Sequence, residues 1–340
     1  MSRRSFLKGS ALVGASAAVG GLGLSPASAQ QNNQNGPIRI VMAGYGPPTT
    51  SFSLALKRIG DRIESKFEGD VEVRYVYNIL DLGYKGLDIL WLVEEGLLTI
   101  GYQSSSYLTD RVHDLGVVDL PFLFSDNQTA RAAMDGELGQ TLTSSIETNM
   151  DYRILGYFEN GLRHMSNRVR PIRSPADMEG LSMRVLPSKV HERTFELLGA
   201  NPEIMDLSEV IKRIKAGTID AQENPFANTV TYGVHNFHKY HTASNHFYIS
   251  RPIFFHRPTF DAWPEELQLE MRAAVKDAVA FQRGLKDQEE TDAAAAIREV
   301  GGEIIELTAA EVEVFVEAVK PVYAEAQTQY TPELLALAGL

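Results

Sequence analysis

The hydrophobic pattern of the chain alternates between short apolar runs and amphipathic stretches. Residues 38–43 are almost wholly apolar, as in a buried strand, and residues 51–67 carry apolar side chains at helical spacing. Residues 71–77 alternate like a half-buried strand, and a helix at 87–98 and a short strand at 99–103 are expected next. Strand–helix–strand alternation of this kind predicts parallel α/β layers.

The same alternation continues toward the carboxyl end, with one exceptional element. The run from Pro264 to about Val300 is helical in pattern, and at 1.5 Å per residue it would extend about 55 Å. That is longer than one domain is wide, so we expect this helix to lie across two domains. Further strands are expected at 153–158, 181–186, 219–222 and 303–307, and further helices at 128–134, 208–215 and 309–326.

Composition narrows the class of protein. The chain has 340 residues, 44% of them hydrophobic, which at roughly 150 residues per domain predicts two domains. It contains no cysteine, so disulfides, thiolate metal sites and cysteine nucleophiles are excluded. The net charge of −12 argues against a nucleic-acid surface built on basic patches.

The first 29 residues have the pattern of an export signal. Arg3-Arg4 is followed by Phe6-Leu7-Lys8, a weakly apolar run to Leu24, and the small-x-small sequence Ala27-Ser28-Ala29. The paired arginines match a twin-arginine signal. A membrane anchor is the alternative, but it needs about 20 strongly apolar residues, and this run is short and rich in Gly and Ala. We therefore expect cleavage after residue 29 and export to the periplasm.

Motifs of common enzyme classes are missing from the sequence. It contains no Gly-x-Ser-x-Gly, His-Glu-x-x-His or P-loop pattern. Gly44-Tyr45-Gly46 follows the first expected strand, but it lacks the third glycine of a dinucleotide loop, and Pro47-Pro48 would break the helix start. The sequence thus predicts neither an enzyme nor a bound cofactor.

Four histidines lie close together in sequence, and steps of three residues could place some of them on one face, where zinc could bind. The surrounding segment is aromatic and holds no neighbouring carboxylate, so packing on a core is the favoured interpretation and no metal is expected. The four are His235, His238, His241 and His246.

Arg184 is the strongest candidate for ligand binding. It lies near the carboxyl end of the strand expected at 181–186, where open α/β sheets bind ligands. A guanidinium matches a carboxylate through two parallel hydrogen bonds. The alternative is a salt bridge to a nearby acid such as Asp177 or Glu179.

Two weaker candidates also follow expected strands. Arg163 comes after the strand at 153–158, although an arginine in a loop is usually solvated. Asn224 ends a short strand, but an Asn before Pro225 is equally often only a turn former.

The order of motifs resembles a known family, the DctP-type solute receptors of tripartite ATP-independent periplasmic (TRAP) transporters. The resemblance covers nearly the whole chain after the signal and includes the long late helix. The motifs that carry it are Asp119-Leu120-Pro121-Phe122-Leu123-Phe124, the segment from Gly156-Tyr157 through Asn167, Asp177-Met178-Glu179-Gly180-Leu181-Ser182-Met183-Arg184-Val185, Ser208-Glu209-Val210, and Gly217-Thr218-Ile219-Asp220-Ala221-Gln222-Glu223-Asn224-Pro225.

The resemblance implies a periplasmic binding protein-like α/β fold, with two α/β domains around a ligand cleft and a long helix spanning both. The implied division is 37–160 plus 250–289 for domain I and 161–249 plus 290–340 for domain II. By analogy with the family, Arg184 would clamp a substrate carboxylate, and Arg163 and Asn224 would assist it.

Other positions are expected to line the cleft. Leu207 occupies a place where relatives can carry an aromatic residue, and the region 80–107 departs from the family pattern. Gln103 belongs to the stretch 102–106, which is expected to line the pocket. The remaining candidates, each equally able to be core packing, are Tyr45, Tyr77, Tyr102 and Tyr248.

The function implied is an extracytoplasmic receptor that binds a small organic acid and delivers it to the membrane permease of a TRAP transporter. Two alternatives stay open at this point: a secreted enzyme acting on carboxylates, and a receptor that reports its ligand to a signalling partner. The sequence leaves the acid open among sugar acids, dicarboxylates, keto acids and aromatic acids, and it leaves the oligomeric state open.

Overall fold

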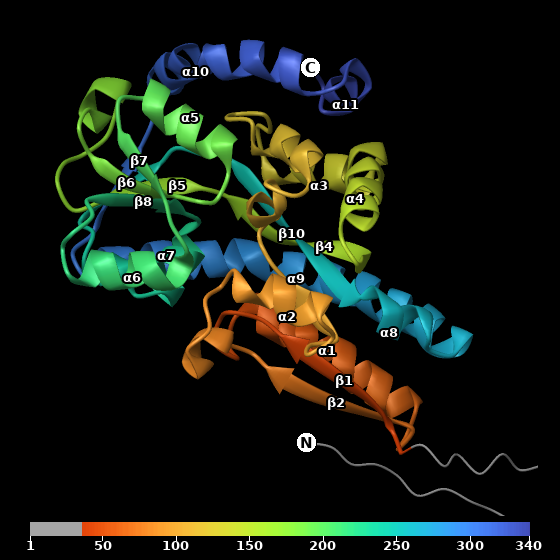
Figure 1. Cartoon of the computed structure of the whole chain (residues 1–340). Helices are drawn as coiled ribbons and strands as arrows, with labels where there is room; N and C mark the ends of the chain where they lie inside the picture. Colours follow the sequence, from red (N-terminus) through yellow and green to blue (C-terminus); the bar gives the residue numbers. More distant parts are fainter. Residues whose placement is uncertain (1–35) are drawn as a thin grey trace, which may run out of the picture. The chain divides into compact units, whose positions relative to one another are not determined.

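A computed structural model describes residues 36–340, so the expected signal peptide at 1–29 lies outside the described residues. Residues Pro37–Leu340 form one compact unit that contains two β-sheets flanked by helices (Figure 1). Within the described residues, no helix is both long enough and apolar enough to cross a bilayer.

The first sheet has five strands in the order β2-β1-β3-β10-β4. Strand β1 runs parallel to β2 and β3, while β10 runs antiparallel to both β3 and β4. The strands are β1 (Ile38–Ala43), β2 (Val71–Val76), β3 (Ile100–Tyr102), β4 (Tyr152–Leu162) and β10 (Tyr248–His256).

The second sheet has six strands in the order β11-β9-β5-β8-β6-β7. It is also mixed, because β5 runs antiparallel to both of its neighbours. The expectation of parallel layers is therefore wrong for β10 and β5, because each runs in the opposite direction to the other strands of its sheet. The strands are β5 (His164–Asn167), β6 (Ser182–Val185), β7 (Asn201–Ile204), β8 (Ala221–Asn224), β9 (Tyr240–Ala243) and β11 (Glu303–Glu306).

The helices form where the apolar spacing predicts them, with one shortened example. Thr50 caps helix α1 through the main-chain nitrogen of Ser53, and α1 buries Leu56, Ile59 and Ile63 against the first sheet. The helix expected at 87–98 ends early, because Gly96 has a φ of 70° that a helix cannot contain. The helices other than the long one are α1 (Ser51–Lys66), α2 (Asp88–Glu94), α3 (Asn127–Asp135), α4 (Glu137–Asn149), α5 (Lys189–Leu197), α6 (Leu207–Lys215), α7 (Phe226–Thr231), α8 (Arg257–Asp261), α10 (Ala309–Gln329) and α11 (Pro332–Leu337).

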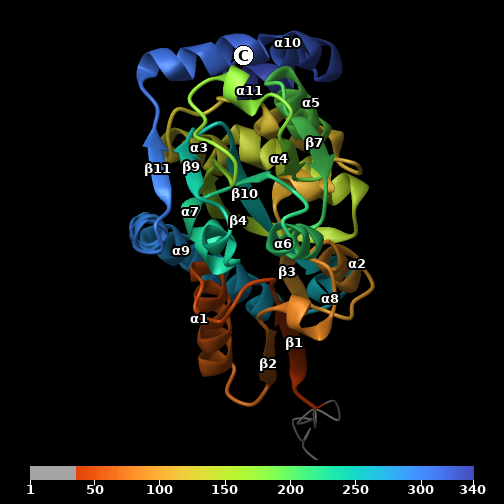
Figure 2. The ribbon, with the colours of Figure 1, turned by 90° about the vertical axis from the view of Figure 1, so that its left-hand side faces the viewer.

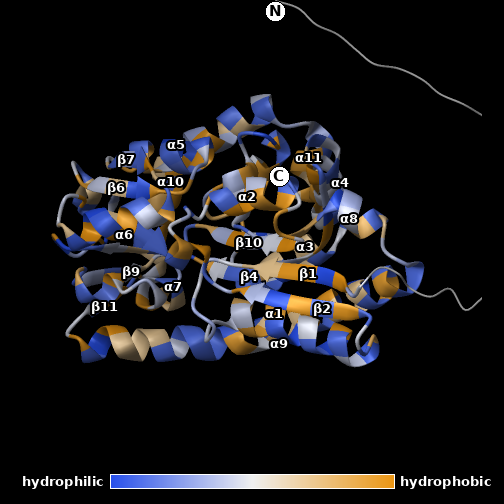
Figure 3. Cartoon of the chain, turned by 60° about the horizontal axis from the view of Figure 1, so that its bottom comes forward, coloured by the Kyte–Doolittle hydropathy of each residue, from blue (hydrophilic) through white to orange (hydrophobic). Residues whose placement is uncertain are grey.

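Helix α9 (Glu265–Glu299) is the long helix that the sequence predicts, and it contacts elements of both sheets. It packs on α1 and β4 of the first and on α7 and β11 of the second, while α10 and α11 lie at the opposite end of the unit from β1 and β2 (Figure 2). Its surface alternates between polar and apolar bands, as expected of a helix with one buried side (Figure 3).

Two adjacent glutamates of α9 bind the starts of two other helices. Glu289 accepts hydrogen bonds from the main-chain nitrogen of Ser51 at 2.7 Å and from its hydroxyl at 2.8 Å, at the start of α1. Glu290 accepts from the main-chain nitrogen of Phe226 at 2.9 Å, at the start of α7. Negative side chains are favoured at helix N-termini, so one turn of α9 binds the N-termini of both α1 and α7.

Candidate ligand-binding site

A small cavity lies between the two sheets and is lined from both sides. Strand ends and the loops that follow them supply most of its wall, which is where α/β sheets commonly bind ligands. From the first sheet and its loops come Tyr45, Ser104, Tyr107 and Arg251, and from the other side come Arg163, Arg184, Leu186, Leu207, Asn224 and Tyr232.

Arg184 lies on β6 with its side chain buried in the cavity wall. Its Nε donates to the main-chain oxygen of Met205 at 3.0 Å, and its Nη2 donates to the hydroxyl of Tyr107 at 3.0 Å. Among the described residues, no carboxylate pairs with it. The alternative of a salt bridge to Asp177 or Glu179 is therefore wrong, because Asp177 instead accepts from the main-chain nitrogens of residues 173 and 174.

Arg163, at the junction of β4 and β5, is buried and already neutralised. Its Nε and Nη2 donate to the carboxylate of Glu223, the latter at 2.8 Å, and Nη2 also donates to the main-chain oxygen of Glu223 at 2.6 Å. Burial alone would raise the pKa of Glu223, but the Arg163 guanidinium outweighs it and lowers that pKa well below its usual range. The interpretation of Arg163 as a solvated loop residue is wrong.

Arg251, on β10, is a third buried arginine in the cavity wall, and the sequence interpretation missed it. Its guanidinium lies over the ring of Phe52 at 4.1 Å and over that of Tyr45 at 4.9 Å, and Nη2 donates to Asn160 Oδ1 at 2.7 Å. The sequence does contain a signal for Arg251, because it is the one charged residue in the largely apolar run Tyr248–Phe255. The same pattern singles out Arg184 within its strand.

Comparison with known proteins assigns the family. Residues 42–329 match the family model DctP, described as "Bacterial extracellular solute-binding protein, family 7". This chain belongs to that family. Residues 1–20 match the signal sequence of the twin-arginine translocation pathway, so this family 7 solute-binding protein is exported to the periplasm, as predicted.

Relatives and solved structures agree with this assignment. The C4-dicarboxylate-binding periplasmic protein DctP of Rhodobacter capsulatus is 30% identical over 96% of this chain and 95% of its own length. A TRAP periplasmic solute binding protein from Sulfurospirillum deleyianum with bound succinate has a TM-score of 0.84 and 25% identity, covering 90% of this chain and 99% of that one. The sugar acid binding protein DctPAm of Advenella mimigardefordensis with galactonate also has a TM-score of 0.84 and 25% identity, covering 89% and 98%.

These matches confirm the resemblance to TRAP solute receptors and the fold class. The two-sheet architecture with a long helix is that of the TRAP periplasmic binding proteins. The domain boundaries at 160/161, 249/250 and 289/290 stay a prediction. The chain passes between the sheets near the first two, and the third lies within helix α9.

Three other predicted residues of this solute-binding protein also line the cavity. Asn224 ends β8 and donates to the side-chain oxygen of Gln222 at 2.5 Å, while Leu207 begins α6 and is buried. The hydroxyl of Tyr45 lies 3.5 Å from Ser104 Oγ, and burial raises the pKa of Tyr45 to about 12, so it remains a neutral hydrogen-bonding group.

The other predicted residues lie outside this cavity. Tyr102 lies behind Tyr45, with ring centroids 5.4 Å apart, and lines a small adjoining cavity. Gln103 is buried and donates to the main-chain oxygen of Gly86 at 2.6 Å. Tyr77 stacks on Tyr75, and the hydroxyl of Tyr248 donates to Glu159 Oε2 at 3.4 Å.

The histidines that lie close together in sequence form individual hydrogen bonds in the structure. Nδ1 of His238 lies 2.9 Å from Ser166 Oγ, and Nε2 of His241 lies 3.0 Å from the main-chain oxygen of His238. His246 does have a carboxylate nearby, contrary to the sequence interpretation, with Nε2 3.6 Å from Glu223. Within residues 36–340, no group of three or more His, Cys, Asp or Glu side chains is arranged to hold a metal ion.

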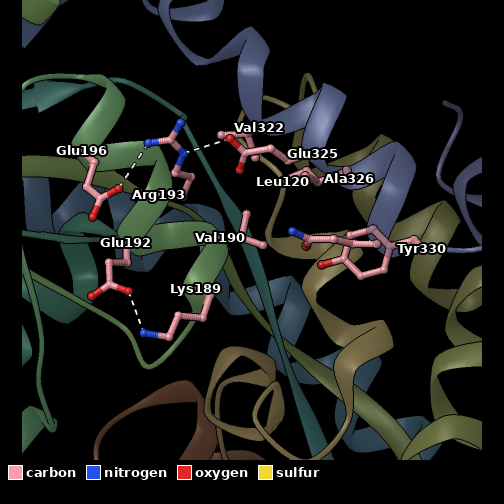
Figure 4. Close-up of a pocket in the computed structure, with 11 residues that line it drawn as sticks. Leu120, Lys189, Val190, Glu192, Arg193, Glu196, Val322, Glu325, Ala326 and Tyr330 are labelled. Carbon is pink, nitrogen blue, oxygen red and sulfur yellow. Dashed lines mark hydrogen bonds and ion pairs between the residues drawn. The ribbon is translucent and has the colours of Figure 1, made fainter.

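A larger hollow of about 230 Å³ lies between α5 and α10, but its charged side chains already pair with one another (Figure 4). Arg193 donates to Glu325 at 3.0 Å and to Glu196 at 3.4 Å, and Lys189 donates to Glu192 at 2.8 Å. Because these cations are already paired with glutamates, we expect the hollow to bind an anion more weakly than the cavity of Arg184 does.

Proposed function

We propose that this solute-binding protein binds a small organic acid through Arg184 and delivers it to the membrane permease of a TRAP transporter. The observation that carries the proposal is a buried guanidinium in a cavity between two sheets, which among residues 36–340 hydrogen-bonds to Met205 and Tyr107 and pairs with no acid. An isolated buried charge is costly, and a ligand carboxylate would offset that cost through charge-assisted hydrogen bonds.

Comparison supports the same class of ligand. The relative from Rhodobacter capsulatus is named for C4-dicarboxylates, and the two similar solved structures contain succinate and galactonate. All of these are carboxylic acids, so a guanidinium in the cavity is the chemistry that the ligand class requires.

We assign supporting roles to the other predicted residues that line the cavity. Asn224 supplies an amide for a second polar group of the ligand, Tyr45 a hydroxyl, and Leu207 an apolar wall. Arg163 would contact the ligand while its charge is balanced by Glu223, so its contribution to affinity is smaller than that of Arg184.

We further propose that the segments 37–160 plus 250–289 and 161–249 plus 290–340 act as two lobes that close on the ligand. The cavity receives side chains from both lobes, so closure would exclude water and strengthen the ion pair. The net charge of −12 does not prevent binding of an anion, because charges beyond about 8 Å are screened at physiological salt.

The test is calorimetry with a panel of organic acids on the wild type, Arg184→Ala and Arg184→Lys. Loss of one partner of a buried charge pair costs about 2–5 kcal/mol, so Arg184→Ala should bind about 30- to 4,000-fold more weakly. Arg184→Lys should fail nearly as badly, because an ammonium cannot reproduce the planar fork.

Arg168→Ala is the matched control, because Arg168 lies just after β5 and forms an exposed pair with Asp220. Affinity of Arg184→Ala within threefold of wild type would remove Arg184 from the site. Recovery of the ligand unchanged supports a receptor, whereas turnover would favour the enzyme alternative. Receptor-dependent uptake of the ligand into vesicles containing a TRAP permease tests the delivery step.

A further inference from the structure

Asp206 lies directly beside the candidate site, between two residues that serve the cavity. Its neighbour Met205 supplies the main-chain oxygen that accepts from Arg184 Nε at 3.0 Å, and its other neighbour, Leu207, lines the cavity wall. Asp206 itself is the residue before helix α6. A contact made by Asp206 therefore acts on the segment that holds the proposed ligand-binding arginine.

The two carboxylate oxygens of Asp206 bind groups on opposite sides of the cavity. Oδ1 accepts from the main-chain nitrogen of Ser208 at 2.8 Å and from its hydroxyl at 2.7 Å, which caps α6. Oδ2 accepts from the main-chain nitrogen of Leu87 at 3.0 Å, at the start of α2. Leu87 belongs to the segment 37–160 and Asp206 to the segment 161–249, so this hydrogen bond joins the two proposed lobes.

The loop that provides Leu87 is fixed to its own lobe. Gln103 Nε2 donates to the main-chain oxygen of Gly86 at 2.6 Å. Gly86 is buried although Leu87 beside it is exposed, and a Cβ atom at Gly86 would lie 3.4 Å from Asp206 Oδ2. Because Gln103 holds this loop in place, separation of the lobes at this point would break the hydrogen bond between Leu87 and Asp206.

We propose that Asp206 is a positioning residue that latches the closed cleft, with one oxygen on α6 and the other on Leu87 of the opposite lobe. This rests on the proposed function, since it concerns how the two lobes hold a ligand at Arg184. The latch, the hydrogen bond from Leu87 N to Asp206 Oδ2, exists only while the lobes are together, so it stabilises the closed state alone. Its loss should raise the dissociation rate of the ligand and leave the association rate nearly unchanged.

The sharpest test removes the donor and leaves every charge in place. Leu87 has a φ of −63°, which suits proline, and its N–H precedes the hydrogen bonds of α2, so Leu87→Pro removes the latch with little strain. Dissociation should become about 2- to 12-fold faster and affinity weaker by the same factor, the range for one hydrogen bond. Stopped-flow mixing and calorimetry measure both, with the panel acid that the wild type binds most tightly, succinate and galactonate included.

A double-mutant cycle assigns the effect to the latch. Asp206→Ser removes the acceptor but keeps an oxygen that can cap α6. It also removes a negative charge beside the site, which affects both arms of the cycle equally. In the Asp206→Ser background, Leu87→Pro should have no further effect, because the bond that it removes is already absent.

Asp126→Ser is the matched control for the loss of a capping carboxylate. Asp126 caps α3 through the main-chain nitrogen of Thr129 at 2.7 Å, and its other oxygen accepts from the neighbouring Ser125. Both partners belong to the same lobe as Asp126, so Asp126→Ser should keep the wild-type rates.

The distance between the lobes gives an independent measurement. The chain contains no cysteine, so Lys57→Cys and Lys215→Cys together place one spin label on the exposed surface of each lobe. With the acid bound, double electron–electron resonance should show one distance in the protein that is otherwise wild type. Leu87→Pro should add a second, open population.

Two results would overturn the inference while the proposed function stands. One is Arg184-dependent binding with an unchanged dissociation rate in Leu87→Pro, and the other is an equal effect of Leu87→Pro with and without the Asp206 carboxylate. If Leu87→Pro does not fold, as judged by circular dichroism, Asp206→Ser is compared with Asp126→Ser, and a wild-type dissociation rate in Asp206→Ser overturns the latch. Failure of the wild type to bind any carboxylic acid would overturn the proposed function itself, and the latch with it.

Discussion

Arg163 and Arg184 are both buried in the wall of one cavity, but different groups hold their charges. Arg163 is paired with the carboxylate of Glu223, whereas Arg184 donates to a main-chain oxygen and a phenol. The first arginine adds little net charge to the cavity, and the second adds a full one. Burial shows where an arginine lies, and the nature of its partner indicates whether it serves the fold or a ligand.

The largest expected effect is on stability, at the paired arginine. Arg163→Met leaves Glu223 buried without its cation, and breaking a buried pair in this way costs about 3–5 kcal/mol. Guanidinium denaturation without ligand measures the free energy of unfolding. Arg184→Met is the matched variant and should stay within about 1 kcal/mol of wild type, because it strands no acid. Equal losses in the two variants would remove the distinction between them.

The pair should also make stability depend on pH, in a direction set by Glu223. Its pKa is lowered in the folded protein, so the pair contributes fully above the ordinary pKa of 4.5. As the pH falls below 4.5, the unfolded chain takes up the proton first, and stability should decrease by up to about 1.4 kcal/mol per pH unit.

Chemical denaturation between about pH 6 and pH 3 measures this dependence. Arg184→Met should keep the acid slope of the wild type, whereas Glu223→Gln should lose the part that belongs to this carboxyl. A slope in Glu223→Gln identical to that of the wild type would show that the pair does not act as described.

The smallest expected effect is at the neutral partner of Arg184. Tyr107→Phe removes one hydrogen bond to the guanidinium, which is worth about 0.5–1.5 kcal/mol and corresponds to about 2- to 12-fold in ligand affinity. Tyr323→Phe is the control, because Tyr323 donates to the main-chain oxygen of Pro121 away from the cavity. Calorimetry with the same acid measures both, and a loss in Tyr107→Phe as large as in Arg184→Ala would contradict the stated role of the guanidinium.

Much of the fold could be predicted because its signals are local. The strand at 38–43, the helix that starts at Ser51 and the long helix that begins after Pro264 all follow from apolar spacing and capping residues. Strand direction could not be predicted in the same way, because the antiparallel pairing of β10 with β4 joins residues about 90 positions apart.

Residue patterns alone indicate the site best at Arg184, whereas the roles of Arg163, Asn224 and Leu207 follow from the family resemblance. Arg184 stands out within its own strand, but the partner of Arg163 is 60 residues away. That contact follows from the pairing of β5 with β8, which sets Met165 opposite Glu223. Arg251 was missed because nothing in its own strand reveals that the rings of Tyr45 and Phe52 will surround it.

The two neighbouring glutamates of α9 set the orientation of this helix as well as joining it to two other helices. Adjacent residues of an α-helix point about 100° apart, so the side chains at 289 and 290 diverge toward Ser51 on one side and Phe226 on the other. These two contacts, made within a single turn, therefore fix the rotation of the 35-residue helix about its own axis. The rest of the helix on either side of that turn follows the same orientation.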